Sequence, residues 1–339
     1  MRTRILVILI SGLVVIGALG IVISGINLPA DSADNQKKPF SVRGGEGFFE
    51  IAANLEKERL IKNRLFFEAA VIFLNGVKRL QAGDYELNPS LSPLQIVEKM
   101  IKGETAAENI TIPEGWTIKD IAWFFENKGA FQTEELYELP LKKFSDKFGF
   151  LREAPKNAGL EGYLFPDTYQ FKRGEMTAEI VAETMLENFG KKMAPEMKTE
   201  IKKQGKTIFE IITMASLLEK EVKTLEEKKL ASGILWKRLG VGMRLQVDAT
   251  LLYALAGQGQ NSKQITFEQT QIDSLYNTYK YAGLPPGPIA NPGLDSIVAA
   301  IYPTDSLYWY YLSTPAGQTL FSQTLEQHNI KKVKYLPSP

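Results

Sequence analysis

The sequence contains no cysteine and only one histidine, His328. Without cysteine the chain can form no disulfide, no thiolate nucleophile and no cysteine-ligated metal site. A Ser-His-Asp triad could use only His328, a zinc site would lack its usual ligands, and no G-x-S-x-G or S-x-x-K sequence supplies a nucleophile. We therefore predict no metal and no cofactor, and expect any catalysis to rest mainly on carboxylates, hydroxyls and amides.

A strong net charge is also lacking, since 40 Lys and Arg residues face 39 Asp and Glu residues. No global field therefore favours nucleic acid, and we predict no nucleic-acid partner. The 339 residues suffice for two or three domains, and a hydrophobic fraction of 44% is ordinary for a globular protein.

The N-terminus carries a long uncharged run, from Ile5 to about Leu28, preceded by Arg2 and Arg4. At ~1.5 Å per residue this run can cross a hydrocarbon core of ~30 Å, and it exceeds the ~7–15 residues of a signal-peptide core. The positive-inside rule places the basic tail in the cytoplasm and the rest outside. We therefore predict that residues 1–28 are a cytoplasmic tail and single transmembrane helix in the cytoplasmic (inner) membrane. A buried core helix is the alternative.

The rest of the chain divides by composition and periodicity into four segments. The predicted fold class is α+β, with short strands, glycine turns and amphipathic helices before a mainly helical C-terminal domain with a short β-hairpin. The predicted segments are a linker at 29–40, a small α/β domain at 41–104, a second α/β connecting subdomain at 105–159 and the C-terminal domain at 160–335.

A weak internal repeat relates the two α/β segments. Residues 42–52 align without gaps with 112–122, and Gly45 is matched with Gly115. Each copy is typical of a strand, a glycine turn and an amphipathic helix. Two interpretations stay open: a common strand–turn–helix unit used twice, or a LysM-like glycan-binding module.

The stretch MASLLEKEV, residues 214–222, continues an apolar helix that starts near Ile208. On a wheel of 100° per residue Glu219 falls on the apolar face, whereas Glu221 points the opposite way, toward solvent. Burial raises the pKa of a glutamate, and a carboxyl that stays protonated can give its proton to a glycosidic oxygen. Glu219 is therefore a candidate general acid. The alternative is a structural ion pair with a buried Lys or Arg, such as Arg244.

The segment at 275–293 is rich in tyrosine, asparagine, proline and glycine. Aromatic faces and amides suit the surfaces of a sugar, and rigid turns hold such groups with little loss of entropy. The alternative is a proline-rich loop packed on the core. A neighbouring segment adds Gln246 and Asp248, although Asp248 can also simply cap the following helix.

Six segments in this order resemble motifs of the MltG/YceG-like family of membrane-anchored endolytic murein transglycosylases. With the N-terminal run and the LysM-like portion, the resemblance covers nearly the whole chain. Its departures are mild: a proline often follows the aspartate of LQVDAT, and the asparagine position of IANPG varies. The segments are EGYLFPDTY (161–169), ASLLEKE (215–221), RLGVGMRLQVDAT (238–250), YNTY (276–279), GLPPGPIANPG (283–293) and HN (328–329).

The resemblance implies that Glu219, the first glutamate of the A-S-x-x-E-K-E motif, is the catalytic acid. It implies non-hydrolytic cleavage of the MurNAc-β-1,4-GlcNAc bond in nascent glycan strands, which limits strand length. Glu219 would protonate the leaving O4, then take the proton of the MurNAc C6 hydroxyl as that oxygen closes on C1. One carboxylate serves both steps, because the nucleophile belongs to the substrate. On this account Glu219 is partly buried with a raised pKa, and Glu221 is dispensable for the chemistry.

The resemblance also implies partners: peptidoglycan strands, the cytoplasmic membrane, and peptidoglycan synthases with other elongation or division proteins. A non-catalytic glycan-binding membrane scaffold and a hydrolytic muramidase are the alternatives. The polar and aromatic motif residues are carried over as candidate substrate-binding residues. They are Glu161, Tyr163, Asp167, Tyr169, Gln246, Asp248, Tyr276, Asn277, Thr278, Tyr279, Pro286 and Asn291.

Overall fold

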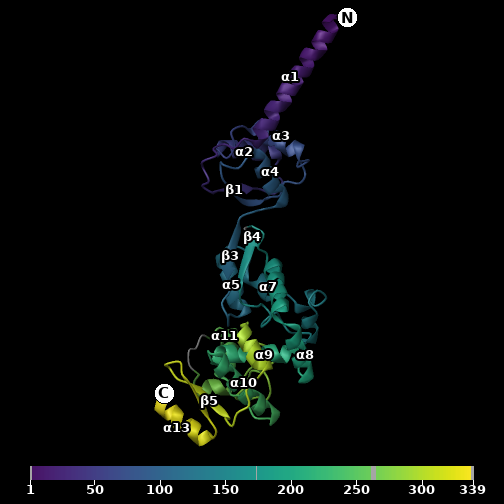
Figure 1. Cartoon of the computed structure of the whole chain (residues 1–339). Helices are drawn as coiled ribbons and strands as arrows, with labels where there is room; N and C mark the ends of the chain where they lie inside the picture. Colours follow the sequence, from purple (N-terminus) through teal and green to yellow (C-terminus); the bar gives the residue numbers. More distant parts are fainter. Residues whose placement is uncertain (1, 173, 261–264, 337–339) are drawn as a thin grey trace. The chain divides into compact units, whose positions relative to one another are not determined.

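The structure is a computed structural model that describes residues 2–172, 174–260 and 265–336, with the side chains of the first helix from residue 11 onward. The chain forms two compact units (Figure 1). Unit 1 comprises Met1–Asn109 and Gln170–Met176, and unit 2 comprises Ile110–Tyr169 and Thr177–Pro339. Each unit is mainly helical and contains short strands.

Unit 1 is built on an antiparallel strand pair with helices packed against it. In the pair, Phe40 lies opposite Tyr85, and both side chains are buried in the core with Leu55 and Phe67. The alternation of buried and exposed residues along both strands gives one core face and one outer face. The elements are β1 (Lys38–Val42), α2 (Phe48–Lys57), α3 (Arg64–Phe73), β2 (Gly83–Leu87) and α4 (Pro93–Lys102).

The strand, glycine turn and helix predicted for both copies of the internal repeat are present. Gly45 and Gly115 have φ values of 85° and 77°, in the left-handed region that glycine tolerates best. Each glycine lies three residues before a helix, α2 in the first copy and α5 (Ile118–Asn127) in the second. The second copy begins with β3 (Ala107–Thr111), which pairs with the later strand β4 (Thr168–Lys172). The structure leaves both interpretations of the repeat open.

Helix α1 (Arg2–Asn27) covers the run predicted to cross a membrane. Among the residues that the structure describes, no helix is both long enough and apolar enough for a membrane span. This finding overturns the prediction of a single transmembrane helix that anchors the chain. The C-terminal end of α1 instead packs against other residues of unit 1. Ile26 is buried in the core of unit 1, and a Cβ on Gly25 would lie 2.2 Å from the Phe66 ring.

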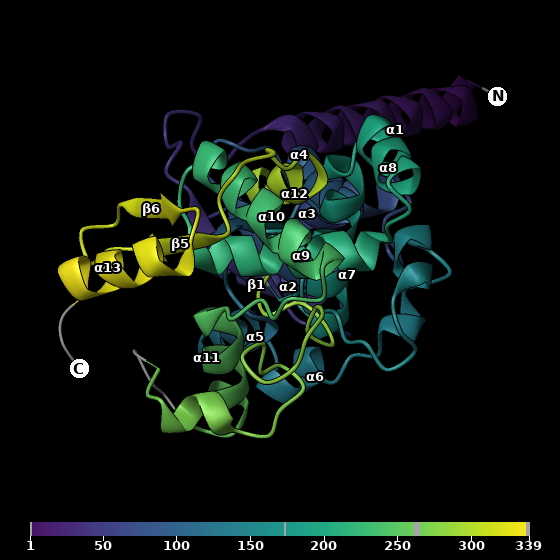
Figure 2. The ribbon, with the colours of Figure 1, turned by 90° about the horizontal axis from the view of Figure 1, so that it is seen from below.

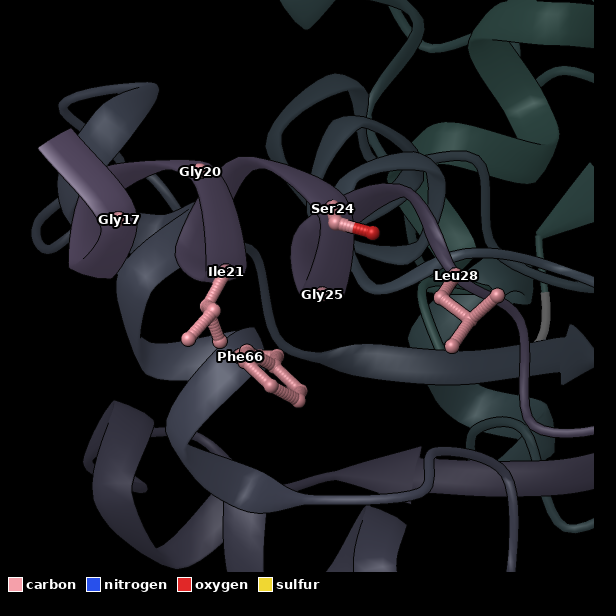
Figure 3. Close-up of a pocket in the computed structure, with 7 residues that line it drawn as sticks. All are labelled: Gly17, Gly20, Ile21, Ser24, Gly25, Leu28 and Phe66. Atoms are coloured by element: carbon pink, nitrogen blue, oxygen red, sulfur yellow. The ribbon is translucent and has the colours of Figure 1, made fainter.

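A groove of about 430 Å³ lies between α1 and α3 within unit 1. Figure 3 shows the Phe66 ring of α3 directed toward Ile21 and Gly25 of α1. The lining contains no titratable side chain, so the groove offers no acid–base chemistry. It is lined by Gly17, Gly20, Ile21, Ser24, Gly25, Leu28 and Phe66.

Unit 2 is organised around α9 (Ile208–Glu221), the helix that contains both glutamates of the ASLLEKE motif. Helix α9 packs against α10 (Leu225–Gly240), α12 (Leu294–Ile301), α11 (Asp248–Gly257) and α8 (Pro195–Lys203). Figure 2 shows α10 and α12 beside α9. The remaining elements are α6 (Thr133–Tyr137), η1 (Leu141–Lys143), η2 (Gly149–Glu153), α7 (Ala178–Lys192), η3 (Glu268–Gln271), β5 (Tyr310–Ser313), β6 (Thr319–Ser322) and α13 (Leu325–Tyr335).

Helix α9 starts at a capping box and is apolar on nearly all sides. The Thr207 hydroxyl accepts from the Glu210 N–H, and the Glu210 carboxylate accepts from the Thr207 N–H. Every residue from Ile211 to Leu218 is buried. Because an all-apolar helix belongs in a core, the polar side chains at its C-terminal end must find partners in neighbouring elements.

Candidate functional site

Glu219 lies in the last turn of α9, and its side chain is 9% exposed. Its Oε2 atom accepts three hydrogen bonds, from the Gly293 N–H at 3.0 Å, the Ser296 hydroxyl at 2.6 Å and the Lys228 ammonium at 3.2 Å. Within the described part of the chain, no donor lies in hydrogen-bonding position to Oε1. The carboxylate is thus fixed through one oxygen only.

Two of these donors lie at the N-terminus of α12. Gly293 is the N-cap residue, and Ser296 lies in the first turn. The free N–H groups and dipole of a helix N-terminus favour a carboxylate. The sequence of α12 thereby places an amide and a hydroxyl on the same oxygen of Glu219.

The third donor, Lys228, is a lysine of α10 whose side chain is only 4% exposed. It forms a buried ion pair with Glu219, the arrangement considered as the alternative to a catalytic role. The partner suggested from the sequence was wrong, because Arg244 is exposed. A buried lysine is rarely found without a partner, so Lys228 fits the helix interior only because the carboxylate faces it.

The turn after β3 packs on the other side of Glu219. The Lys220 ammonium donates to the Gly115 carbonyl at 3.0 Å, and the Gly115 N–H donates to the Asn291 carbonyl at 2.9 Å. A Cβ on Gly115 would lie 3.5 Å from Glu219 Cγ, in ordinary contact. The turn of the second repeat copy is therefore part of the wall around the candidate acid.

A second carboxylate, that of Glu114, belongs to the same turn. Partial burial and repulsion by Glu219 raise the pKa of the Glu114 carboxyl. Unlike Glu219, the Glu114 residue is exposed. The site thus combines a nearly buried carboxylate with an exposed one. Among the residues described, no group of three His, Cys, Asp or Glu could hold a metal ion.

Glu161 and Asn291, two of the candidate substrate-binding residues, lie together in the interior behind this site. The Asn291 amide donates to Glu161 Oε1 at 3.0 Å, and Glu161 also accepts from the Ile118 N–H and the Tyr253 hydroxyl. Burial raises the pKa of Glu161 to about 8. Asn291 precedes Gly293 by two residues, so this pair supports the loop that carries a donor to Glu219.

Glu221 does not point to solvent, so that prediction was wrong. Its carboxylate interacts with the Tyr311 hydroxyl and the Ala249 N–H. Burial and the nearby Asp248 carboxylate raise the pKa of Glu221 to about 7. The helical wheel failed because α9 is covered on both sides: α12 lies against Glu219, while β5 and the start of α11 lie against Glu221.

The YNTY motif mainly holds its own loop together. Asn277 is fully buried, donates to the carbonyls of residues 270 and 272, and accepts from the Tyr279 N–H. The buried Thr278 hydroxyl is 3.0 Å from that of Thr250. The Tyr279 hydroxyl donates to Asp248 in the first turn of α11. Contact of these residues with substrate stays a prediction.

Other candidate residues are divided between surface and core. Gln246, Asp248 and Pro286 are exposed, and Gln246 has a φ of 54°, uncommon for a non-glycine residue. The Tyr276 ring lies 5.1 Å from that of Tyr253. The exposed members are the ones that a substrate can reach directly.

The EGYLFPDTY motif supplies a third group. The Asn188 amide donates to Asp167 at 3.0 Å and to the Tyr169 hydroxyl at 3.1 Å. Tyr163 is fully buried, and its hydroxyl has no partner among the described residues. In the same part of the chain, no hydrogen bond joins Glu219 to Asp167, Asn277 or Tyr279. The candidate residues thus form separate groups around the site.

Four residues of the site were not predicted from the sequence: Glu114, Lys228, Gly293 and Ser296. A usable signal existed for Lys228, which shares a helical face with the apolar Ala231 and Leu235. A signal also existed for Glu114: the repeat alignment matches it with Gly44, so the second copy has a carboxylate where the first copy has no side chain. Gly293 and Ser296 act through an amide and a hydroxyl that only the fold brings to Glu219.

The sequence and structure of the chain are similar to those of known proteins. The YceG-like family matches the chain over residues 40–334. The chain belongs to the YceG-like family. A relative named endolytic murein transglycosylase, from Bacillus subtilis (strain 168), is 31% identical in an alignment of 325 positions. This alignment covers 91% of this chain and 88% of that protein.

Two further proteins support the assignment to the YceG-like family. A protein of the same name from Streptococcus pneumoniae (serotype 2, strain D39) is 33% identical over 92% of this chain. The matched region is 60% of the length of the S. pneumoniae protein. A crystal structure of a YceG-like protein from Listeria monocytogenes is 34% identical, with a TM-score of 0.60 over 88% of this chain and 99% of that one. Family membership therefore extends over both units.

Proposed function

We propose that this protein is an endolytic murein transglycosylase. It cleaves the β-1,4 bond between MurNAc and GlcNAc within nascent glycan strands, leaves 1,6-anhydro-MurNAc ends and thereby limits strand length. The names of the B. subtilis and S. pneumoniae relatives support this activity. The structural observation that carries it is Glu219, whose Oε2 is held by three donors while Oε1 is free of them.

The geometry suits one carboxylate that gives and then takes a proton. Glu219 donates a proton from Oε1 to the leaving O4 of GlcNAc as the C1–O4 bond breaks. The three donors on Oε2 then stabilise the resulting carboxylate. That carboxylate accepts the C6 hydroxyl proton of MurNAc while O6 bonds to C1, so the enzyme returns to its starting state without water. Protonation of Glu219 before cleavage stays a prediction.

The substrate sets where the protein acts under this proposal. Murein lies outside the cytoplasm, so the catalytic unit acts there. Because the substrate is the nascent strand, peptidoglycan synthases and other elongation or division proteins are the proposed neighbours.

One observation favours a second candidate, a non-catalytic glycan-binding protein of the wall-synthesis machinery. The buried pair of Glu219 and Lys228 is also what a purely structural glutamate would form. The aromatic and amide groups around the loop at 275–293 would then bind glycan without cleaving it. The two candidates differ in whether the free Oε1 of Glu219 is used.

Digestion of purified murein, followed by mass spectrometry of the fragments, tests the proposal. The wild type should release anhydro-ended fragments, and the nearly isosteric Glu219→Gln should release none. Release of fragments heavier by one water would identify a hydrolytic muramidase. Absence of cleavage by the wild type would favour the non-catalytic candidate.

A further inference from the structure

Gly293 separates two carboxylates. Its N–H donates to Glu219 Oε2 at 3.0 Å. A Cβ added to Gly293 would lie 2.0 Å from Glu114 Oε1 and 2.7 Å from Oε2, so the Glu114 carboxyl group occupies the space of a side chain at this position. Any larger residue at position 293 would therefore displace the Glu114 carboxyl group from the site.

The place of Glu114 is fixed by its backbone. The next residue, Gly115, has a φ of 77°, donates to the Asn291 carbonyl and accepts from the Lys220 ammonium. These bonds tie the turn to α9 and to the loop before α12. The glutamate side chain starts from this fixed turn and reaches Gly293.

Charge couples the two carboxylates. Partial burial is the main cause that raises the pKa of Glu114, and repulsion by Glu219 is the next. Electrostatic interaction is mutual, so the negative charge of Glu114 acts on Glu219 in the same way. Two neighbouring carboxylates resist being ionised together, which favours a proton on one of them.

We propose that the negative charge of Glu114 counteracts the positive charge of Lys228 at the catalytic acid. Glu114 thereby keeps the proton on Glu219 until the glycosidic oxygen is in place. This inference rests on the proposed function. Glu114 is a positioning residue in this role, since it acts through Glu219. Lys228 favours the carboxylate that acts as base, and Glu114 favours the carboxylic acid that acts first.

Two further charged groups lie near Glu114, Asp295 and Lys220, and neither is changed in the variants that test this balance. Asp295 of α12 is exposed and adds to the repulsion on Glu114, while the Lys220 ammonium of α9 is bound to a carbonyl. The remaining elements that pack on α9 place their charges elsewhere. Glu153 of η2 accepts from the Ile208 N–H at the start of α9, and Asp248 of α11 lies near Glu221.

The experiment measures the initial rate of anhydro-end release from murein against pH. Glu114→Gln removes the charge, and Gly293→Ala keeps it but displaces the side chain. Alanine suits the Gly293 backbone, with φ −73° and ψ 172°, and retains the N–H that binds Glu219. Glu226→Gln is the matched control, an exposed glutamate in the first turn of α10.

The alkaline limb of the profile reports loss of the acid's proton. In Glu114→Gln and Gly293→Ala this limb should move to lower pH by about one unit, equal to a roughly tenfold lower rate above the limb. Glu226→Gln should follow the wild type. Both variants remove the same effect, that of the Glu114 charge on Glu219. The double variant should therefore move the limb no further than either single variant.

Two results would overturn the inference. If Glu114→Gln lowers the rate equally at every pH and the limb stays in place, Glu114 has only a structural role, and the proposed function still stands. If the wild type releases no anhydro ends at any pH, the proposed function fails and this inference fails with it.

Discussion

Glu219 and Lys228 form a buried ion pair that joins α9 to α10, with 3.2 Å between the carboxylate Oε2 and the ammonium Nζ. Both side chains are less than a tenth exposed. Removing either charge from water is costly, and the cost is offset only while the other charge is present. The pair therefore contributes to folding and to the chemistry proposed for Glu219.

Lys228→Met should destabilise unit 2, because it leaves the carboxylate without its cation. We expect a loss of about 3 kcal/mol in the free energy of unfolding at neutral pH. The double variant with Glu219→Gln should lose at least about 1 kcal/mol less than the sum of the two single losses. Urea denaturation of the four proteins measures this coupling, and strictly additive losses would show that the two groups do not interact.

Ser296→Ala should slow cleavage about tenfold with little effect on the fold, because it removes one of the three donors that fix Oε2 of Glu219. Ser232→Ala is the matched control: Ser232 is also a fully buried helical serine, but its hydroxyl has no partner among the described residues. The initial rate of anhydro-end release compares them. Equal rates for the two variants would argue against a contribution of the Ser296 hydroxyl.

Glu161 should make stability depend on pH. The folded state raises the pKa of Glu161 from its ordinary 4.5 to about 8, so the folded state binds this proton more tightly than the unfolded state. Stability from this group is present at low pH and is lost as pH rises from about 4.5 through 8. Thermal unfolding should show this fall, on the order of 5 kcal/mol, and Glu161→Gln should flatten it. An unchanged slope in the variant would assign the dependence to other groups.

Glu221 should support the hairpin of β5 and β6. Tyr311→Phe removes the hydroxyl that interacts with the Glu221 carboxylate and should cost about 1 kcal/mol of stability, while cleavage stays near the wild-type rate. Tyr281→Phe, which changes an exposed tyrosine, is the control. A loss of cleavage in Tyr311→Phe at temperatures where the protein is folded would place the Glu221 side of α9 in the chemistry.

Local patterns predicted local structure well. The apolar helix predicted to start near Ile208 is α9, and the short β-hairpin predicted for the C-terminal domain is β5 and β6. The repeat alignment correctly placed two glycine turns and two helices. Each of these depends on periodicity or turn chemistry within a short segment, which a sequence displays directly.

Partners across the fold could not be predicted in the same way. The wheel placed Glu219 on the apolar face, but it could not show that Lys228 and the α12 N-terminus meet it there. For Glu221 the same wheel failed, because a polar side chain can lie in the interior once a tyrosine hydroxyl satisfies it. Hydropathy alone also suggested a membrane span for α1, whereas the structure shows its last turn packed in unit 1.

The most direct test of the account compares the two glutamates of α9 in one murein digest. Glu219→Gln and Glu221→Gln are the same chemical change two residues apart on one helix, so differences in folding can be checked by thermal unfolding. Mass spectrometry should find anhydro-ended fragments with the wild type and with Glu221→Gln, and none with Glu219→Gln. Fragment release by Glu219→Gln at the wild-type level, or its loss only in Glu221→Gln, would contradict the assignment of Glu219 as the acid.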